Sequence, residues 1–311
     1  MSGFDPFKNF PTSQSAPESP APPHAQKMDL FPFLPEDQGN MLYMDIGGTN
    51  IRAIELPRWT PTEFFGHLQE NPEKEMTRIP WSSTGGCQDL ASIVKGLASK
   101  NVSRIVMGLP GPQVSSNGRE YHGWLVDKGV PRNLAEILEK DLRLEEGSVS
   151  LQVDTLAWGQ GVKALMRLCR KRPHGGVGLL VMGTGVAFSI ISDTGITSLG
   201  VCDSWYDWKE LCGIAYCEVE AHAVHRHLAS EYFEWRKTQQ WDSKALQRNA
   251  QDRLQAVLKE LERHHHVENW VVAGGYASEF ENGLYSYRIE FLTKSRLHFD
   301  PGFIPLVGLI A

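Results

Sequence analysis

Two segments of the chain share one arrangement, in which a short glycine-containing turn lies between two apolar strands. The first turn is GGTN at 47–50, between the apolar stretches 42–46 and 51–56, and the second is GTG at 183–185. Gly48 and Gly183 lie 135 positions apart (183 − 48). The repetition predicts two similar lobes that each contribute a hairpin turn to one ligand, with two unrelated hairpins as the alternative.

The first turn differs from the two commonest phosphate-binding loops. Loops of the GxGxxG and GxxxxGK[ST] types lead into a helix whose N-terminus holds the phosphate. Here the turn leads into the short apolar stretch 51–56 and then Pro57, and neither glycine spacing is present. The sequence therefore argues against the Rossmann and P-loop folds and indicates a turn between two strands.

Strands and helices are predicted to alternate along the rest of the chain. Expected strands are residues 42–46, 51–56, 104–109, 149–153, 178–182, 186–192 and 269–273. Expected helices are residues 90–97, 132–142, 155–170, 218–236, 244–265 and 304–311. Such alternation is typical of an α/β fold with mostly internal sheets.

Composition excludes several classes of protein. The chain has 311 residues, a net charge of −6 and no basic stripe, so no nucleic-acid partner is expected. No apolar run is long and unbroken enough for a membrane span, and the N-terminus lacks the pattern of a secretory signal. Five cysteines without a CxxC pair do not suggest a disulfide framework, so a cytoplasmic protein is expected. Residues 1–40 hold eight of the eighteen prolines and are predicted to form a disordered leader.

The residue types around the two turns suit an anionic ligand. Glycines let backbone N–H groups approach an anion closely, hydroxyl and amide side chains donate hydrogen bonds, and an arginine adds positive charge. The aspartate at the end of the first strand is the kind of oxygen ligand that Mg²⁺ accepts, here through water. The candidate residues are Asp45, Gly47, Gly48, Thr49, Asn50, Arg52, Gly183, Thr184 and Gly185.

Further motifs, taken in order, resemble a known family. "DIGGTN-x-R" resembles the first phosphate motif of the actin-like ATPase and sugar kinase superfamily, and more narrowly of the glucokinase-like ROK (repressor, open reading frame, kinase) family. The other matching motifs are "VMGLPGPQV", "HGWLVDKGVPRNLAEIL", "LQVDTLAWGQG", "VMGTGVAFSII", "VVAGGYAS" and "FIPLVGLIA". Each motif is weak alone, but their order matches the family from residue 41 to residue 311.

The resemblance implies a two-lobed actin-like (ribonuclease H-like) α/β fold with a cleft between the lobes. It implies an N-terminal lobe at 41–152, a C-terminal lobe at 153–300 and a final helix at 301–311 that packs back on the N-terminal lobe. It also implies ATP and Mg²⁺ as cofactors and a small-molecule sugar as partner, and it leaves a homodimer open. Gly274 and Gly275 would let the adenosine approach, and Gly111, Gly123 and Glu220 would contact the sugar; a solvated helix glutamate is the alternative for Glu220.

Asp154 has two interpretations. It follows an apolar strand and opens a predicted helix, where an aspartate commonly caps the free N–H groups of the first turn. The resemblance places the family's proton-accepting aspartate at this position, where a kinase needs a base beside the attacking hydroxyl. We expect Asp154 to be the catalytic base, and the two roles can coexist.

The chain departs from the family pattern on the sugar side. The family has Asn-Asp where this chain has Val153 and Asp154, and the Glu-x-x-His segment that follows the second phosphate motif is missing. Cys212 and Cys217 echo half of the family's zinc motif, with Cys202 and His222 as further candidate ligands. A closed zinc site needs four such ligands, so buried structural cysteines are expected instead of zinc.

The sequence therefore favours an ATP-dependent hexose kinase. The first alternative is a catalytically weak or inactive relative that binds a nucleotide or sugar as a sensor or interaction module. A kinase for a non-sugar hydroxyl is a further alternative. The sugar and the phosphoryl donor, ATP or polyphosphate, stay open.

Overall fold

The computed structural model describes most of the chain. The described residues are 7, 39–47, 50–80, 89–110, 118–122, 125–126, 129–171, 176–182, 186–202, 255, 258–259, 262, 266–275, 277–280 and 289–311. Among the helices in these ranges, none combines the length and the apolar character needed to cross a bilayer.

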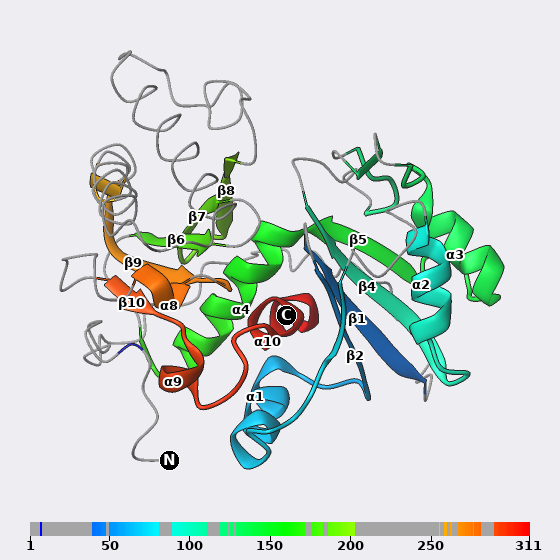
Figure 1. Cartoon of the computed structure of the whole chain (residues 1–311), viewed down its shortest axis with the longest axis horizontal. Helices are drawn as coiled ribbons and strands as arrows, with labels where there is room; N and C mark the ends of the chain where they lie inside the picture. The colour runs from blue at the N-terminus through cyan, green and yellow to red at the C-terminus, as the bar shows by residue number, and fades with distance from the viewer. Residues whose placement is uncertain are drawn as a thin grey trace, which may run out of the picture.

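The chain forms two five-stranded sheets with the same topology (Figure 1). The first sheet has the order β3-β2-β1-β4-β5, with the bounds β1 Asn40–Ile46, β2 Asn50–Leu56, β3 Thr77–Pro80, β4 Val102–Leu109 and β5 Val149–Val153. The second has the order β10-β9-β6-β7-β8, with the bounds β6 Gly176–Met182, β7 Val186–Ile191, β8 Ile196–Cys202, β9 Val267–Ala273 and β10 Ile289–Phe291. In each sheet the first three strands in chain order pair antiparallel, the fourth pairs in parallel with the first, and the fifth pairs in parallel with the fourth.

The two glycine turns occupy equivalent places in the two sheets. The first joins β1 to β2 and the second joins β6 to β7, and each pair is antiparallel. The two similar lobes predicted from the repeated turns are therefore confirmed, as is the α/β class predicted from the alternation of strands and helices. The division of the chain at residues 152 and 153 stays a prediction.

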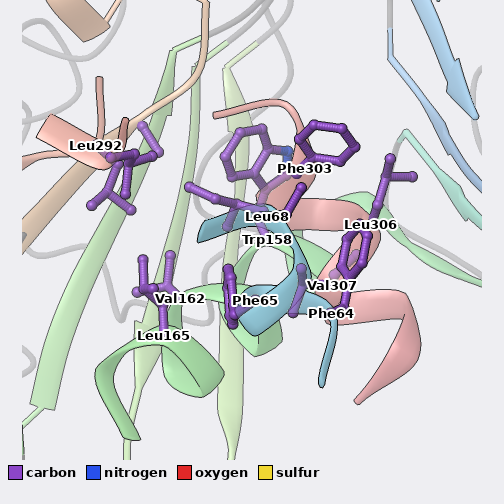
Figure 2. Close-up of a cluster of buried hydrophobic side chains, with 14 of the residues drawn as sticks. Phe64, Phe65, Leu68, Trp158, Val162, Leu165, Leu292, Phe303, Leu306 and Val307 are labelled. Atoms are coloured by element: carbon purple, nitrogen blue, oxygen red, sulfur yellow. The ribbon is translucent and has the colours of Figure 1, made fainter. Parts of the chain in front are cut away.

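Three helices fill the space between the two sheets, namely α4 (Asp154–Leu168), α10 (Phe303–Ile310) and α1 (Pro61–Glu70) (Figure 1). Their apolar side chains form one buried cluster with the inner faces of both sheets, which we call the inter-sheet core. Figure 2 shows aromatic residues of α1 and α10 packed together. The ring centroids of Phe64 and Phe303 lie 5.6 Å apart, and the rings meet edge to face. The C-terminus thus lies at the centre of the molecule.

Helices α4 and α10 cross with their backbones in contact. A Cβ built on Gly308 would lie 2.6 Å from the carbonyl carbon of Ala157, and one built on Gly161 would lie 2.8 Å from that of Ile304. Real side chains do not approach backbone atoms this closely. The crossing therefore needs glycine at both positions.

A second apolar cluster, the outer core, lies on the other face of the first sheet under α2 (Leu90–Leu97) and α3 (Leu134–Leu142) (Figure 1). Alternation along β1 assigns its side chains to the two cores: Leu42 and Met44 belong to the outer core, and Tyr43 belongs to the inter-sheet core. The two short helices α8 and α9 span Ala277–Phe280 and Lys294–Leu297.

The predicted elements within the described residues are confirmed to within about two residues at each end. The helix predicted at 90–97 and the strand at 149–153 have the expected bounds. Missed elements were β3, β8, β10, the short helices α8 and α9, and α1, although α1 carries a start signal. The hydroxyl of Thr60 accepts the Glu63 N–H, and the Glu63 carboxylate accepts the Thr60 N–H, with Pro61 at the first turn. The helices predicted at 218–236 and 244–265 lie outside the described residues, apart from isolated positions.

One residue of the predicted leader is buried. Phe7 is fully buried in the inter-sheet core, so at this position the leader differs from the expectation that residues 1–40 bury little apolar surface. Apart from residues 39–40, which begin β1, the rest of the leader lies outside the described residues.

An ion pair fixes the segment before α3. Arg119 donates to both carboxylate oxygens of Glu139 on α3, at 2.6 Å for one of them. The same carboxylate accepts the N–H groups of Gly147 and Val149. Burial alone would raise the pKa of Glu139, but these hydrogen bonds hold it below its ordinary value.

We expect Glu139→Gln to lower the free energy of unfolding by about 1.5–3 kcal/mol at pH 7, because hydrogen bonds to a charged group are lost. A lowered carboxyl pKa stabilises the fold above its unfolded value of about 4.5. That stabilisation is lost as pH falls through the folded pKa, so the difference from the parent should shrink at acid pH. Melting temperatures of the parent and the variant from pH 4 to 8 would measure this difference in stability. The control is Glu136→Gln, at an exposed glutamate of the same helix. A difference independent of pH would contradict the assignment.

Candidate functional site

The parallel strands β1, β4 and β5 place two carboxylates at one edge of the first sheet. Their register pairs Asp45 with Gly108 and Leu109 with Val153. Asp154 follows Val153 directly as the first residue of α4. The carboxyl ends of parallel strands in an open sheet are where ligands commonly bind.

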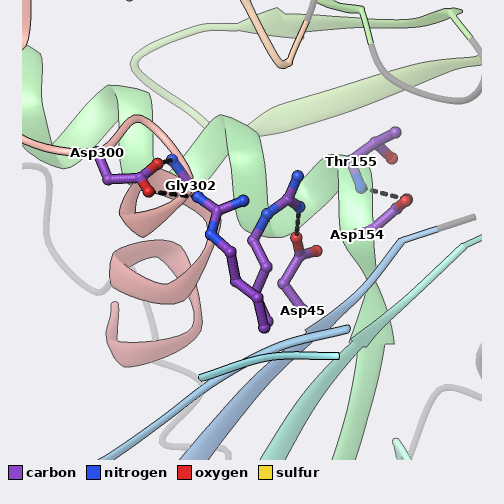
Figure 3. Close-up of polar contacts among 7 residues, drawn as sticks. Asp45, Asp154, Thr155, Asp300 and Gly302 are labelled. Atoms are coloured by element: carbon purple, nitrogen blue, oxygen red, sulfur yellow. Dashed lines mark hydrogen bonds and ion pairs between the residues drawn. The ribbon is translucent and has the colours of Figure 1, made fainter. Parts of the chain in front are cut away.

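Gly108 lies next to both carboxylate residues. It neighbours Asp45 across β1 and β4, and a Cβ built on it would lie 3.6 Å from the Cα of Asp154. That Cβ would point toward α4 and α10, and Asp45 alternates with Tyr43 toward the same inter-sheet face. Asp45 and Asp154 therefore lie on the same face of the sheet at the same edge (Figure 3).

Asp154 takes part in the start of its helix. Its Oδ1 accepts the N–H of Thr155 at 2.7 Å, while the N-cap position itself is held by Val153. The side chain is half-buried. A carboxylate at a helix N-terminus is stabilised by the helix dipole. The capping interpretation is therefore partly met.

Asp45 is held by an arginine from the neighbouring strand. Arg52 faces it across β1 and β2, and its Nη1 lies 2.5 Å from Asp45 Oδ2. Asp45 is only 1% exposed. Burial raises the pKa of Asp45, and the positive charge of Arg52 offsets this only in part.

Arg52 also reaches the segment before the C-terminal helix. A Cβ built on Gly302 would lie 3.2 Å from the Arg52 Nε and 3.0 Å from a guanidinium nitrogen of Arg78. Arg78 on β3 pairs with Asp300, which accepts the Gly302 N–H at 2.8 Å through its other oxygen. The buried Arg52 Nε has no hydrogen-bond partner within the described part of the chain. One ion pair, Arg78 with Asp300, thus connects the first sheet to the start of α10, and Arg52 lies beside it.

The first turn is closed by its own backbone. The N–H of Gly47 donates to the carbonyl of Asn50 at 2.9 Å. This N–H is therefore engaged within the turn. The two residues between them, Gly48 and Thr49, lie outside the described residues.

Two glycines after β9 lie beside the second turn. Gly274 has a φ of +100°, and a Cβ built on it would lie 2.7 Å from the carbonyl carbon of Met182, the last residue of β6. Only glycine suits this backbone conformation and this close approach. No atom of the described residues lies within 4 Å of a Cβ built on Gly275. The first glycine of the predicted adenosine motif is thus next to the end of β6, the strand that precedes the predicted second phosphate turn in the chain.

Other predicted site residues lie outside the described residues; they are Gly111, Gly123, Gly183, Thr184, Gly185, Cys212, Cys217 and Glu220. The side chain of Cys202 and all of His222 are also outside them. Within the described ranges, no three His, Cys, Asp or Glu residues form a group that could hold a metal.

Magnesium does not fit Asp45 in this arrangement. Mg²⁺ keeps several waters and needs room around a ligating carboxylate. Asp45 is almost fully buried, and the oxygen Oδ2 is bonded to Arg52. We therefore assign no role to a magnesium ion at Asp45.

Only weak signals in the sequence indicated the residues that were missed. Gly108 belongs to the GLPGP motif, but its contact with Asp154 depends on β4, β5 and α4 packing together. The stretch from Asp300 to Gly302, with proline between, is a typical turn sequence. Its pairing with Arg78, 222 positions earlier, could not be foreseen.

Comparisons with known proteins extend this description. No protein-family model and no curated protein matches the chain. An inorganic polyphosphate/ATP-glucomannokinase from Arthrobacter sp. strain KM matches with 19% identity and a TM-score of 0.52, over 88% of this chain and 97% of that one. A ROK family glucokinase from Streptomyces griseus, in complex with glucose and AMPPNP, matches with 14% identity and a TM-score of 0.51, over 87% and 98% of the two chains.

A third solved structure is similar. A ROK family protein from Streptococcus pneumoniae TIGR4, in complex with sucrose, matches with 15% identity and a TM-score of 0.51, over 87% of this chain and 97% of that one. Identities this low establish the fold alone. The chain therefore has the two-lobed α/β fold of the ROK sugar kinases and glucokinases, the actin-like ATPase fold.

Proposed function

We propose that the chain is an ATP-dependent sugar kinase that transfers the γ-phosphoryl group to a hexose hydroxyl. The observation that carries the proposal is the position of Asp154, at the first turn of α4 and beside Gly108 at the edge that also holds Asp45. The shared fold of sugar kinases supports it. The proposal includes lobes at 41–152 and 153–300, with the ligand between them.

In the proposed reaction, Asp154 accepts the proton of the sugar hydroxyl as the hydroxyl oxygen bonds to the γ-phosphorus. The bond between that phosphorus and the leaving oxygen of ADP breaks, and the products are a sugar phosphate and ADP. Phosphoryl transfer depends mainly on positioning and charge stabilisation. The backbone turns at 47–50 and 183–185 would hold the phosphates, and Gly275 would face the nucleoside. Closure of the lobes would exclude water from the reacting groups.

A second candidate function is a weak or inactive relative that binds a nucleotide or sugar. The ion pair of Arg52 with Asp45 favours it, because this pair occupies the carboxylate expected to position magnesium.

The proposed function is tested by product formation over a panel of hexoses and N-acetylhexosamines. ATP and polyphosphate are supplied as alternative donors, and ADP release or sugar phosphate is measured with a control that lacks sugar. Sugar-dependent product supports the kinase. Nucleotide or sugar binding without product on any substrate would contradict it and favour the second candidate.

We expect Gly275→Val to weaken adenine nucleotide binding about ten-fold, because its side chain would occupy space proposed for the nucleoside. The melting temperature should stay unchanged, because a Cβ at this position lies within 4 Å of no described atom. The matched control is Gly195→Val, since Gly195 also has no described atom within 4 Å of its Cβ position and lies in the turn between β7 and β8. Fluorescent-nucleotide titration measures the affinity. Equal affinity in both variants would place the nucleoside elsewhere.

A further inference from the structure

Tyr121 is a fully buried tyrosine whose hydroxyl joins two loops of the first lobe. The hydroxyl donates to the carbonyl of Pro110, and it accepts the N–H of Leu125 at 3.4 Å. Pro110 follows β4 directly, and Leu125 belongs to the loop before α3. That loop is closed by the Val130 N–H, which donates to the Leu125 carbonyl at 3.0 Å.

Tyr121 is itself held firmly. Its ring belongs to the outer core, and its N–H donates to the carbonyl of Arg132 at 2.9 Å. Three residues earlier, the Gly118 carbonyl accepts the Leu151 N–H of β5 at 2.9 Å. The segment between them is fixed to α3 through the ion pair of Arg119. The hydroxyl therefore has a fixed position, from which it bonds Pro110 and Leu125.

The joined loops lie at the edge that carries Asp154. Leu109, which precedes Pro110, pairs with Val153, which precedes Asp154. A shift of Pro110 would therefore move a residue next to the proposed base.

We propose that Tyr121 is a positioning residue that fixes Pro110 and Leu125 relative to Asp154, the base beside the sugar hydroxyl, and thereby sets the affinity for the sugar. This role rests on the proposed sugar kinase function. Loss of the hydroxyl leaves a buried carbonyl and a buried N–H without their partner, and the two loops lose their common anchor.

The test is Tyr121→Phe, which keeps the ring and removes only the hydroxyl. We expect the sugar KM, and the sugar Kd measured by calorimetry, to rise about five-fold to ten-fold, as for the loss of one buried hydrogen bond. The kcat and the nucleotide Kd should stay within about two-fold of the parent, because Asp154 is held by the start of α4 and Gly275 follows a strand of the other sheet. Hydrogen exchange at the Leu125 amide should become faster.

Two control variants separate positioning from general loss of stability. Tyr43→Phe makes the same chemical change on the other face of the sheet, where the hydroxyl contacts only the Met41 sulfur at 3.1 Å among the contacts the structure shows. Ile105→Val weakens the same outer core without touching the hydrogen bonds. Both should keep the sugar Kd of the parent.

A sugar Kd in Tyr121→Phe equal to that in Ile105→Val would overturn the proposal, as would unchanged exchange at the Leu125 amide. A parent that binds sugar without turning it over would contradict the proposed function alone. In that case the rise in sugar Kd in Tyr121→Phe would still support the positioning role.

Discussion

Replacing Asp154 by asparagine is expected to lower sugar-dependent turnover by about 10²–10⁴-fold, the usual contribution of a general base. Asparagine cannot accept the hydroxyl proton, but its side-chain oxygen can still accept the Thr155 N–H that Asp154 accepts in the fold. The melting temperature and the affinities for nucleotide and sugar should therefore stay close to those of the parent.

The measurement is kcat at saturating sugar and donor, with melting curves beside it. Asp193→Asn is the matched control, because Asp193 is an exposed aspartate between β7 and β8, away from the sheet edge. Turnover in Asp154→Asn equal to that of the Asp193 control would remove Asp154 from the role of base. Asp154 would then have only a structural role, at the start of α4.

Replacing Gly308 by alanine is expected to reduce the free energy of unfolding by about 3 kcal/mol or more, because the added Cβ overlaps the α4 backbone at Ala157. The helices must separate to admit it, which disturbs the inter-sheet core on both sides. A fall of roughly 5 °C in Tm is expected for a chain of 311 residues. Thermal and urea unfolding measure the change.

The control for Gly308→Ala is Gly66→Ala in α1. Gly66 is also a helical glycine, but no atom of the described residues lies within 4 Å of its Cβ position. Alanine there is expected to stabilise the protein by about 0.4–1 kcal/mol, since it favours the helix over the unfolded chain. A Gly308→Ala variant that melts with the parent would show that the two helices can move apart without cost.

Local patterns in the sequence predicted most of the described elements. Apolar alternation located the strands around the first turn, and helical spacing located residues 90–97. Such patterns depend on which face of an element is buried, which neighbouring residues already reveal. The helix α1 was missed because its short amphipathic pattern is weak, although the capping sequence at Thr60 and Glu63 marks its start.

The candidate site was predicted unevenly. Asp154 was located because a strand, an aspartate and a helix follow one another in the chain. The engagement of Asp45 was not foreseen, because it depends on the strand register that places Arg52 opposite it and on the burial of both side chains. The same holds for Tyr121, whose two hydrogen-bond partners lie on different loops.

The sequence by itself determined the class of fold, the repeated turn between paired strands and the aspartate at the start of α4, because each depends on residues close together in the chain. Only the tertiary structure decided how the two sheets share one core. The ion pair of Arg78 with Asp300 joins residues 222 positions apart, and the contact of Gly308 with Ala157 requires α10 to return to the centre of the molecule. Packing over such separations depends on the shape of the whole fold, which local spacing does not encode.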